Sequence, residues 1–404
     1  MKTIKLSPFL LLMALPVVVR AQFEYAANKG EITIMRYTGS GGAVTIPVKI
    51  NGLPVTIIGS SATGLAGIVS SAFYGCVALT NITIPSNVTD IGSFAFGGCF
   101  NLTNATIPNS VTSIGNDAFS DCESLHHIAI PNSVTNIGSG AFEGCFELAD
   151  IVIPSGVTSM GDAPFSFCTS LKTITVNAQN LFYSSVDGVL FDKSQTKIIQ
   201  CPGGITGSYI IPSSVTSIGN GAFECCGLTN VLIPSSVTSI GSNAFDACHL
   251  ISVTIPSSVT NIGMGSFYWC MSLTSVTIPN SVSGLGASSF SGCTSLTNIV
   301  IPTNVGNIGC NAFQGCYGLT TATIPRSVTN IESDAFGNCS NLTSIYFQGN
   351  PPTLNPDSLF GVNVGGNVFY HDHMATVYYL PNTRGWESTF GGLPTALKSP
   401  VSAK

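Results

Sequence analysis

Charged residues are scarce in this sequence of 404 residues, since 8% of them are Asp, Glu, Lys or Arg, against about a quarter in typical soluble domains. Lysine and arginine form no cluster, and the formal net charge is −6. A chain without basic clusters lacks the usual means of binding nucleic acid or an anionic membrane surface. We therefore expect neither of these as a partner.

Motifs that carry common chemistries are also missing. The sequence has no Cys-x-x-Cys pair for zinc, no Gly-x-Ser-x-Gly nucleophile elbow, no phosphate-binding loop with a lysine and no His-Glu-x-x-His stretch. Glutamates are few and scattered, so no pair of carboxylates can be nominated for hydrolysis. We predict that the protein is not an enzyme and has no catalytic residues, no cofactor and no metal site.

The apolar run near the start of the chain is too short to cross a membrane. It extends from Leu6 to Val19, is interrupted by a serine and two prolines, and falls below the roughly 20 residues that span a bilayer. Two lysines precede it and Val19-Arg20-Ala21 follows it, which is the pattern of a secretory signal peptide cut after Ala21. We predict a signal peptide at residues 1–21, and a protein that is secreted or on the cell surface without membrane insertion.

Repetition dominates the rest of the chain. The phrase Ala-Phe-x-x-Cys, or a close variant, recurs with a usual period of 23 residues, which is typical of a solenoid. Between these phrases the chain repeats Leu-Thr-x-Ile-x-Ile-Pro-x-Ser-Val-Thr-x-Ile-Gly, as at Leu79–Gly92. Each coil has too few apolar residues to bury a core alone, so the coils must stack on one another. The repeat phenylalanines are Phe96, Phe119, Phe142, Phe165, Phe223, Phe245, Phe267, Phe290, Phe313 and Phe336.

Fourteen cysteines in an exported protein would ordinarily indicate a disulfide framework. Their spacing argues against one, because all except Cys201, Cys225 and Cys310 lie three residues after a repeat phenylalanine. A ladder of equivalent buried positions suits a small apolar side chain with a weak S–H donor. We expect reduced structural thiols there, with bridging between neighbours or metal binding as the alternatives.

Each coil reads as two short strands and a closing turn. The Leu-x-x-Ile-x-Ile stretch alternates and is rich in β-branched residues, and the proline after it ends the strand. Val-Thr-x-Ile suits a second strand, and we expect the glycine that follows to form a tight corner. The Ala-Phe segment then closes the coil, and a single helical turn is one conformation that we expect for it.

The repeat is bounded and interrupted. Residues 22–70 are less regular and are predicted to be an N-terminal cap, residues 71–347 the solenoid, and residues 348–404 a C-terminal cap. The phenylalanine spacing jumps between Phe165 and Phe223, where we place an inserted hairpin at about 177–211 with Gly188–Ile199 as its centre. This hairpin is either a projecting contact element or a tolerated elaboration of one coil.

The strand phrase resembles the leucine-rich repeat pattern, with Leu79, Ile82 and Ile84 at its leucine positions and Asn87 at its asparagine. With the Ile-Pro, Ile-Gly and Ala-Phe-x-x-Cys phrases, the chain is similar to the BspA-type branch of leucine-rich repeat proteins. The resemblance implies a right-handed, curved, β-rich solenoid of the α/β kind with a parallel sheet on its concave face. It also implies a microbial surface protein that serves adhesion, and it transfers no catalytic residue.

Side chains between the apolar strand positions must point outward. They are mostly hydroxyls and amides, which suit a broad contact with an extracellular protein or glycan. The other interpretation is a neutral, β-favouring surface kept by recent duplication. The candidate binding residues are Thr80, Asn81, Thr83, Thr103, Asn104, Thr106, His126, His127, Asp150, Lys172, Thr274, Thr277, Thr320 and Thr323.

Three less regular spots carry other chemistry. His126, His127, Asp150 and Lys172 interrupt the neutral columns, and His127 and Asp150 would share a column on adjacent strands. This is a small pH-sensitive binding spot or ordinary surface variation. His371-Asp372-His373 is a weak metal signal or a solvated loop. Trp386, with Tyr378 and Tyr379, is a binding hot spot or the core of the terminal cap.

Two functions therefore compete. The first is a secreted or cell-surface adhesion module that binds an extracellular protein or glycan through its repeated face. The second is a structural surface protein that associates with copies of itself.

Overall fold

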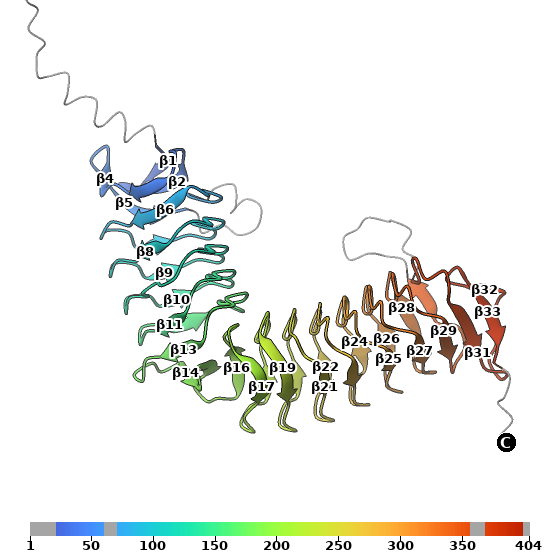
Figure 1. The fold of residues 1–404 in the computed structure, drawn as a ribbon. Helices are drawn as coiled ribbons and strands as arrows, with labels where there is room; N and C mark the ends of the chain where they lie inside the picture. Colours follow the sequence, from blue (N-terminus) through green and yellow to red (C-terminus); the bar gives the residue numbers. More distant parts are fainter. Residues whose placement is uncertain (1–21, 60–70, 356–367, 399–404) are drawn as a thin grey trace, which may run out of the picture. The chain divides into compact units, whose positions relative to one another are not determined.

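The computed structural model describes residues 22–59, 71–355 and 368–398, so the predicted signal peptide at residues 1–21 lies outside the described residues (Figure 1). Short β-strands joined by turns make up the described residues, which contain no helix. In that part of the chain, accordingly, no helix is long and apolar enough to cross a membrane. The chain divides into two compact units, Met1–Leu190 and Phe191–Lys404.

The first unit begins with less regular strands. An antiparallel hairpin of β1 and β2 is followed by β5, which pairs parallel to β2 and antiparallel to β4. From β5 onward the same sheet continues with parallel pairing into the repeats. The five strands are β1 (Phe23–Asn28), β2 (Glu31–Tyr37), β3 (Gly42–Thr45), β4 (Lys49–Ile50) and β5 (Leu53–Ile58).

Most repeats of the first unit supply the two strands that their sequence predicts, but the coil of Leu125 supplies only the second, with a single bridge between Asn104 and His127 in place of the first. The Leu-x-x-Ile phrase forms β6 (Leu79–Thr83), β8 (Asn104–Thr106), β11 (Asp150–Ile153) and β13 (Thr173–Val176). The Val-Thr-x-Ile phrase forms β7 (Asp90–Ile91), β9 (Ser113–Ile114), β10 (Asn136–Ile137) and β12 (Ser159–Met160). Strands of one kind pair in parallel with their counterparts in the next coil, in sheets ordered β3-β6-β8, β11-β13 and β1-β2-β5-β7-β9-β10-β12.

The elaboration between Phe165 and Phe223 contains three of the remaining strands. They are β14 (Tyr183–Val186), β15 (Val189–Asp192), within which the two units divide, and β16 (Lys197–Gln200). The turn from β15 to β16 is closed by Asp192, whose Oδ1 accepts the N–H groups of Thr196 and Lys197 at 2.7 and 2.8 Å. The Ser194 and Thr196 hydroxyls also donate to the Asp192 carboxylate. Burial alone would raise the pKa of Asp192, but the four hydrogen bonds together outweigh burial and lower it.

The second unit repeats the same arrangement. Its strands at the Val-Thr-x-Ile position are β18 (Ser217–Ile218), β20 (Ser239–Ile240), β22 (Asn261–Ile262), β24 (Gly284–Leu285), β26 (Asn307–Ile308) and β28 (Asn330–Glu332), and β30 (Thr353–Asn355) pairs with β28 without that phrase. Its other strands are β17 (Thr206–Ile210), β19 (Gly227–Leu232), β21 (Ser252–Thr254), β23 (Ser275–Thr277), β25 (Asn298–Val300), β27 (Thr321–Ile324), β29 (Ser344–Phe347), β31 (Thr376–Tyr379), β32 (Thr389–Phe390) and β33 (Leu393–Leu397). The predicted β-solenoid of stacked parallel strands is confirmed.

Parallel pairing continues beyond the last recognisable repeat, because β31 pairs with β29 and β33 pairs with β31. Only β32 reverses direction, as an antiparallel partner of β33. The division into caps at residues 22–70 and 348–404 stays a prediction.

A column of phenylalanine rings forms the centre of each unit. In the first unit Tyr37 and Phe73 precede the ladder that runs from Phe96 to Phe165, with ring centroids 5.0–5.5 Å apart. In the second unit the ladder from Phe223 to Phe336 has centroids 4.9–5.6 Å apart, and Phe369 extends it. The repeat phenylalanines have no exposed surface. Burying one such side chain contributes roughly 1.5–3 kcal/mol, and the stacked contact adds to that.

The segment around each phenylalanine is a series of turns, not the helical turn considered from the sequence. Residues two before and two after the phenylalanine have left-handed backbone, as at Asp117 (φ 52°) and Asp121 (φ 53°) around Phe119. The turns of neighbouring coils are joined by backbone hydrogen bonds, such as Phe119 N–H to Ala141 C=O at 2.8 Å. The hydrogen-bonded ladder therefore runs through the turns as well as the strands.

The cysteine ladder is a hydrogen-bonded part of the core. Most buried ladder thiols donate to the carbonyl of the phenylalanine in the preceding coil, as Cys122 Sγ does to Phe96 at 3.3 Å and Cys270 Sγ to Phe245 at 3.0 Å. Cys226, which follows the elaboration, instead donates to the carbonyls of Cys201 and Pro202. These cysteines are unbridged, as predicted. Burial raises the pKa of Cys270 and Cys316 to about 12, so the thiols stay protonated and remain donors.

The glycine of the Ile-Gly phrase has a different role from the one predicted. Gly115, Gly138 and Gly309 do not have a positive φ, so they do not serve as left-handed corners. A Cβ atom on Gly138 would instead lie 2.4 Å from the backbone nitrogen of Asn116 in the preceding coil. Glycine is needed here because the two backbones approach too closely for any side chain.

The close approach of the two backbones predicts that Gly309→Ala destabilises the second unit. Its Cβ atom would lie 2.7 Å from the nitrogen of Ala287, and backbone cannot move aside as a flexible side chain can. We expect the free energy of unfolding to fall by about 1–3 kcal/mol, measured as a lower midpoint in urea.

Gly306→Ala is the matched control in the same coil. Its nearest neighbour would be the Ser283 carbonyl oxygen at 3.9 Å, and its φ is not positive. We expect little change or a small gain in stability from this substitution. Equal destabilisation by both variants would show that the close approach at Gly309 is not the cause.

Candidate functional site

The predicted binding residues lie on or directly before the strands formed by the Leu-x-x-Ile phrases, except His126 and His127, whose coil forms only a bridge at His127. All of them are exposed except Asn81 and Thr323, which are half-buried. In the first unit Asn81 pairs with Asn104 and Thr83 with Thr106. In the second unit Thr277 pairs with Thr254, and Thr323 lies between Val300 and Tyr346. Equivalent positions thus form columns across neighbouring coils, as the repeat predicts.

Threonines at the first outward position of each phrase, such as Thr103, use their hydroxyl groups for hydrogen bonds within the protein. The hydroxyl of Thr103 donates to the Thr80 carbonyl at 3.0 Å, and Thr274 and Thr320 donate in the same way to the carbonyls of Ile251 and Thr297. A donor used inside the protein is not available to a ligand. These threonines therefore tie coils together and offer a partner mainly acceptor oxygens.

The next column of the first unit is chemically more varied. It contains Asn81, Asn104, His127 and Asp150, because Asn104 forms a parallel bridge with His127 and the side chains of His127 and Asp150 meet. His127 Nδ1 lies 3.7 Å from Asp150 Oδ1, and these side chains are 71% and 60% exposed. An ion pair this exposed contributes at most about 1 kcal/mol to stability. We refer to these four residues as the polar column.

Lys172 and His126 do not join this pair. Lys172 belongs to the neighbouring column, since its backbone N–H donates to the Ala149 carbonyl at 3.1 Å, and the Ala149 N–H is directed at the carbonyl of His126. The structure therefore brings together two of the four residues that interrupt the neutral columns.

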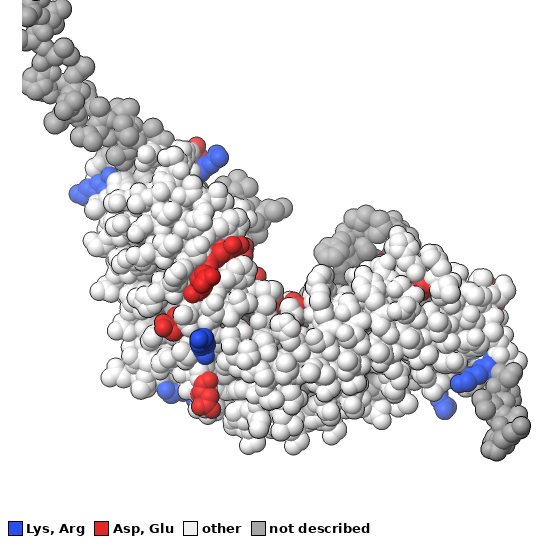
Figure 2. Space-filling view, in the orientation of Figure 1, with Lys and Arg blue, Asp and Glu red and all other residues white. Residues whose placement is uncertain are grey.

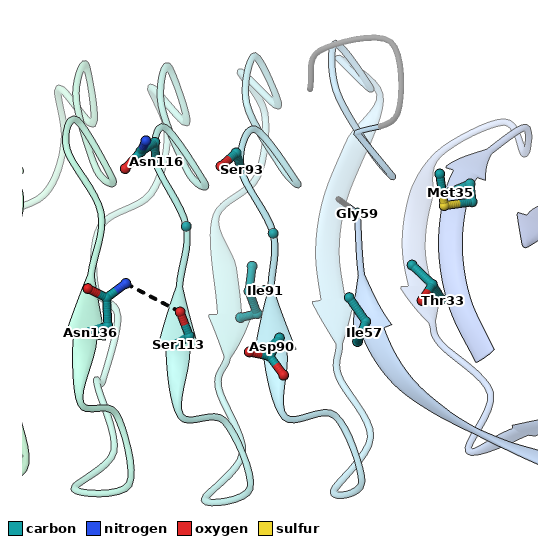
Figure 3. A pocket seen from close by; sticks show the side chains of 12 residues that line it. Thr33, Met35, Ile57, Gly59, Asp90, Ile91, Ser93, Ser113, Asn116 and Asn136 are labelled. Atoms are coloured by element: carbon teal, nitrogen blue, oxygen red, sulfur yellow. Dashed lines mark hydrogen bonds between the residues drawn. The ribbon is translucent and has the colours of Figure 1, made fainter. Parts of the chain in front are cut away.

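A shallow hollow of about 530 Å³ lies on the other sheet of the first unit (Figure 3). Thr33 and Met35 of β2, Ile57 of β5, Asp90 of β7 and Ser113 of β9 line it, together with Asn136 of β10. The Asn136 amide donates to the Ser113 hydroxyl at 3.3 Å. Asp90 is the one charged residue of the lining, and its carboxylate accepts the Thr89 hydroxyl at 2.6 Å. The hollow offers polar contacts but no nucleophile with an adjacent base.

The hollow was not predicted, because the alternation of Val-Thr-x-Ile indicates only a strand. The polar residue at x, which is Asp90, Ser113, Asn136 and Ser159 in successive coils, is the signal that would have indicated a solvent-facing row.

Charge is unevenly distributed. Figure 2 shows that acidic side chains gather over coils of the first unit, whereas most of the visible surface is uncharged. Burial raises the pKa of Asp117 in this unit, and the nearby Asp121 carboxylate raises it further. Among residues 22–59, 71–355 and 368–398, no three His, Cys, Asp or Glu side chains are placed to hold a metal ion.

The two histidines of the His371-Asp372-His373 stretch lie close together, with ring centroids 5.8 Å apart, whereas Asp372 between them is buried. The His371 ring stacks on Tyr370 at 3.9 Å, and its Nδ1 lies 3.1 Å from the Asn338 side-chain oxygen. Asp372 is 1% exposed, so the interpretation of this stretch as a solvated loop is wrong for its carboxyl group. Asp372 lies three residues after Phe369, which is the ladder position that cysteine fills in the repeats.

The aromatic residues near the C-terminus serve two roles. Trp386 packs against Phe347, Phe390 and Tyr379 at centroid distances of 5.0–5.3 Å, which makes it part of the terminal core. Tyr378 instead stacks on Tyr346 at 5.3 Å on the strand side, where Lys398 Nζ lies 4.3 Å from the Tyr346 ring.

Comparison with known proteins agrees with this architecture. Residues 66–196, 205–283 and 260–377 match the family model described as BspA type leucine rich repeat region. The chain belongs to the BspA-type leucine-rich repeat family. Comparison with curated proteins gives no significant match.

Solved bacterial proteins share the fold of this BspA-type chain. A leucine rich cell surface protein from Faecalibacterium prausnitzii is 32% identical, with a TM-score of 0.57 over 81% of this chain and 93% of that one. A leucine-rich repeat protein from Eubacterium ventriosum is 26% identical, with a TM-score of 0.61 over 80% and 88%. The pneumococcal vaccine antigen PcpA, at 20% identity and a TM-score of 0.58 over 94% and 98%, shares the fold alone.

The buried Asp372 of this BspA-type protein predicts a pH-dependent stability. Burial raises the pKa of Asp372 to about 7, while an N–H of Cys339 partly offsets the effect. The folded protein keeps this proton at pH values where the unfolded chain has released it, because aspartate in an unfolded chain ionises near pH 4. The stability contribution is present at low pH and is lost as pH rises from about 4 to about 7.

Asp372→Cys restores the ladder residue and removes this loss. We expect the variant to exceed the natural protein in free energy of unfolding by about 1–3 kcal/mol at pH 8 and by much less at pH 4.5, measured by urea unfolding at both pH values. Asp150→Ala, which replaces an exposed carboxylate, is the control and should shift stability little. A difference between Asp372→Cys and the natural protein that does not change with pH would contradict this account.

Proposed function

We propose that this protein is a secreted or cell-surface recognition module that binds an extracellular protein or glycan through its repeated strand face. The polar column of Asn81, Asn104, His127 and Asp150 is the observation that carries the proposal. It places amide, imidazole and carboxylate groups on four successive coils with mostly exposed side chains. The threonine columns beside it supply acceptor oxygens and a flat, neutral surround.

A binding role fits the chemistry better than a catalytic one. Catalysis requires a nucleophile or acid–base pair held together with a shifted pKa in a cleft. The groups that carry strongly raised pKa values here are the buried ladder thiols, Asp372 and Asp246. All are buried, and burial raises the pKa of Asp246 to about 6 in the turn beside Phe245, where no cleft among the described residues adjoins it. The polar column is open to solvent and suits contacts spread over several coils, as in other solenoids.

An extracellular site of action is supported by two observations. The first residues have the pattern of a secretory signal peptide. The solved relative that is 32% identical is itself described as a cell surface protein. Adhesion is the form of recognition that we propose, because a face repeated from coil to coil favours many weak contacts.

Self-association is the second candidate, and exposed apolar residues favour it. Ile210, Leu232 and Val300 are 69%, 59% and 68% exposed on strands β17, β19 and β25 of the second unit. Apolar side chains on a strand face are typical of surfaces that pack against another protein. In a structural surface protein, a second copy of the chain would cover these apolar side chains.

The test is binding of residues 22–404 to an array of extracellular proteins and glycans, with the oligomeric state followed by light scattering. We expect a saturable interaction that the double variant Asn104→Ala/His127→Ala weakens about tenfold, as loss of interface contacts commonly does. Asn109→Ala changes an exposed residue in the turn after β8 and should leave the affinity unchanged.

The two candidates give different results. Binding that the double variant leaves intact would exclude the polar column as the contact. No binding to any array member, together with oligomers that grow with protein concentration and that Leu232→Ser abolishes, would favour self-association over recognition.

A further inference from the structure

A trough with a volume of about 350 Å³ lies on the turn side of the second unit. It extends over four successive coils, those of Phe267, Phe290, Phe313 and Phe336. The position two residues after the phenylalanine is Trp269 in the first of these coils, Gly292 and Gly315 in the next two, and Asn338 in the fourth. The trough exists because two adjacent coils lack a side chain where their neighbours carry one.

Trp269 is an unusual residue for its position. Its backbone has a φ of 54°, a left-handed conformation that glycine adopts readily and that bulky side chains rarely adopt. Glycine fills the equivalent position in the next two coils. The tryptophan gains little core burial in return, because 49% of it is exposed. The left-handed backbone itself is common to this position, as at Phe167 and Ala247, so the exposed indole is what distinguishes Trp269.

The indole ring is held in place although it is exposed. Its Cδ1 atom would lie 2.9 Å from a Cβ atom on Gly292, so the ring rests against the turn of the next coil. Tyr268 supports it at a centroid distance of 6.0 Å. A side chain in place of the Gly292 hydrogen would collide with the ring and displace it. The glycine therefore positions Trp269 as a platform at one end of the trough.

The remaining lining combines apolar surface with neutral polar groups. Met271 and Tyr317 are 46% and 52% exposed. Ser291, Gln314 and Asn338 add hydroxyl and amide groups, each of which contains both donors and acceptors. The lining has no charged residue. Its composition matches small-molecule sites, which are largely apolar and aromatic with a few polar groups that fix orientation.

We propose that this trough binds a neutral oligosaccharide, with one pyranose ring stacked on Trp269. The C–H face of a pyranose is apolar and packs on an aromatic ring, while its hydroxyl groups both donate and accept hydrogen bonds, as the polar groups of the lining do. An uncharged lining matches a neutral sugar and not an acidic one. The coils beneath it are 5.2–5.6 Å apart, so the trough is elongated and suits a linear chain of sugars.

This inference extends the proposed recognition function to a second face and names its ligand class. A proline-rich peptide is the other ligand that aromatic grooves commonly bind. Its backbone offers acceptors but few donors, so it would leave the side-chain oxygen of Gln314 without a donor, whereas a sugar hydroxyl can supply one. The observations therefore favour the sugar, and the peptide becomes an outcome of the test.

The test uses tryptophan fluorescence, because the chain has two tryptophans. Trp386→Phe keeps an aromatic ring in the terminal core and leaves Trp269 as the reporter. This protein is titrated with a β-1,3-glucan, a β-1,4-glucan, a galactomannan and an α-mannan, and with a proline-rich peptide. We expect a saturable shift of the emission with at least one polysaccharide.

Trp269→Gly removes the platform without a risk to folding, since glycine accepts the left-handed backbone. We expect its affinity for the same polysaccharide, measured by calorimetry, to fall at least about tenfold while its urea midpoint is unchanged or higher. Phe100→Thr removes an exposed aromatic residue of the first unit and should bind as the natural protein does.

Three outcomes would overturn the inference: no shift with any of the polysaccharides, equal binding by Trp269→Gly, or Trp269-dependent binding of the peptide alone. The strand-face variant Asn104→Ala/His127→Ala separates this site from the proposed function. It should bind the polysaccharide normally. Array binding without any polysaccharide binding would overturn the trough proposal and leave the strand-face proposal standing. Polysaccharide binding without any other binding to the array would overturn the strand-face proposal and leave the trough proposal standing.

Discussion

Everything in this structure depends on stacking equivalent coils at one fixed spacing. The strands must lie about 4.8 Å apart to share backbone hydrogen bonds, and offset aromatic rings are stable from about 4.5 Å between centroids. The repeat phenylalanines, at 4.9–5.6 Å, satisfy both conditions at once. Other repeated residues follow from this spacing. The thiol reaches the carbonyl of the previous coil, and the Ile-Gly glycine has no room for a Cβ atom.

The same spacing explains why charge is so scarce. A charged residue repeated in every coil would face copies of itself about 5 Å away, and like charges on directly opposite strand positions destabilise a sheet. Neutral hydroxyls and amides avoid this repulsion, and threonine gains a hydrogen bond to the neighbouring coil. A carboxylate is tolerated where its neighbour in the column is not acidic, as for Asp150 beside His127. Burial raises the pKa of Asp117, and the approach of the Asp121 carboxylate raises it further.

Periodicity made most of the fold predictable from the sequence. Alternation around Leu79 and Ile82 indicated which side chains are buried, and counting from one repeat phenylalanine to the next placed His127 beside Asp150. What periodicity could not reveal were contacts between backbones. The role of Gly138 depends on its distance from Asn116 in another coil, which no local pattern encodes. Asp372 was missed because the longer interval from Phe336 to Phe369 hides its place in the cysteine ladder.

Trp269 could not be predicted from the alternation of the strands, because it lies in a turn. Outward positions were sought on the strands, where alternation identifies them, so the turn positions beside the phenylalanine were not considered. The same left-handed position is filled by glycine at Gly292 and Gly315 and by alanine at Ala247, so the architecture does not require a side chain as large as tryptophan there. Stability is a sum over coils and their interfaces, so one coil can carry a locally unfavourable residue while its neighbours hold the stack together. In a solenoid of this kind, the residue that departs from its column without improving the packing is the best guide to function.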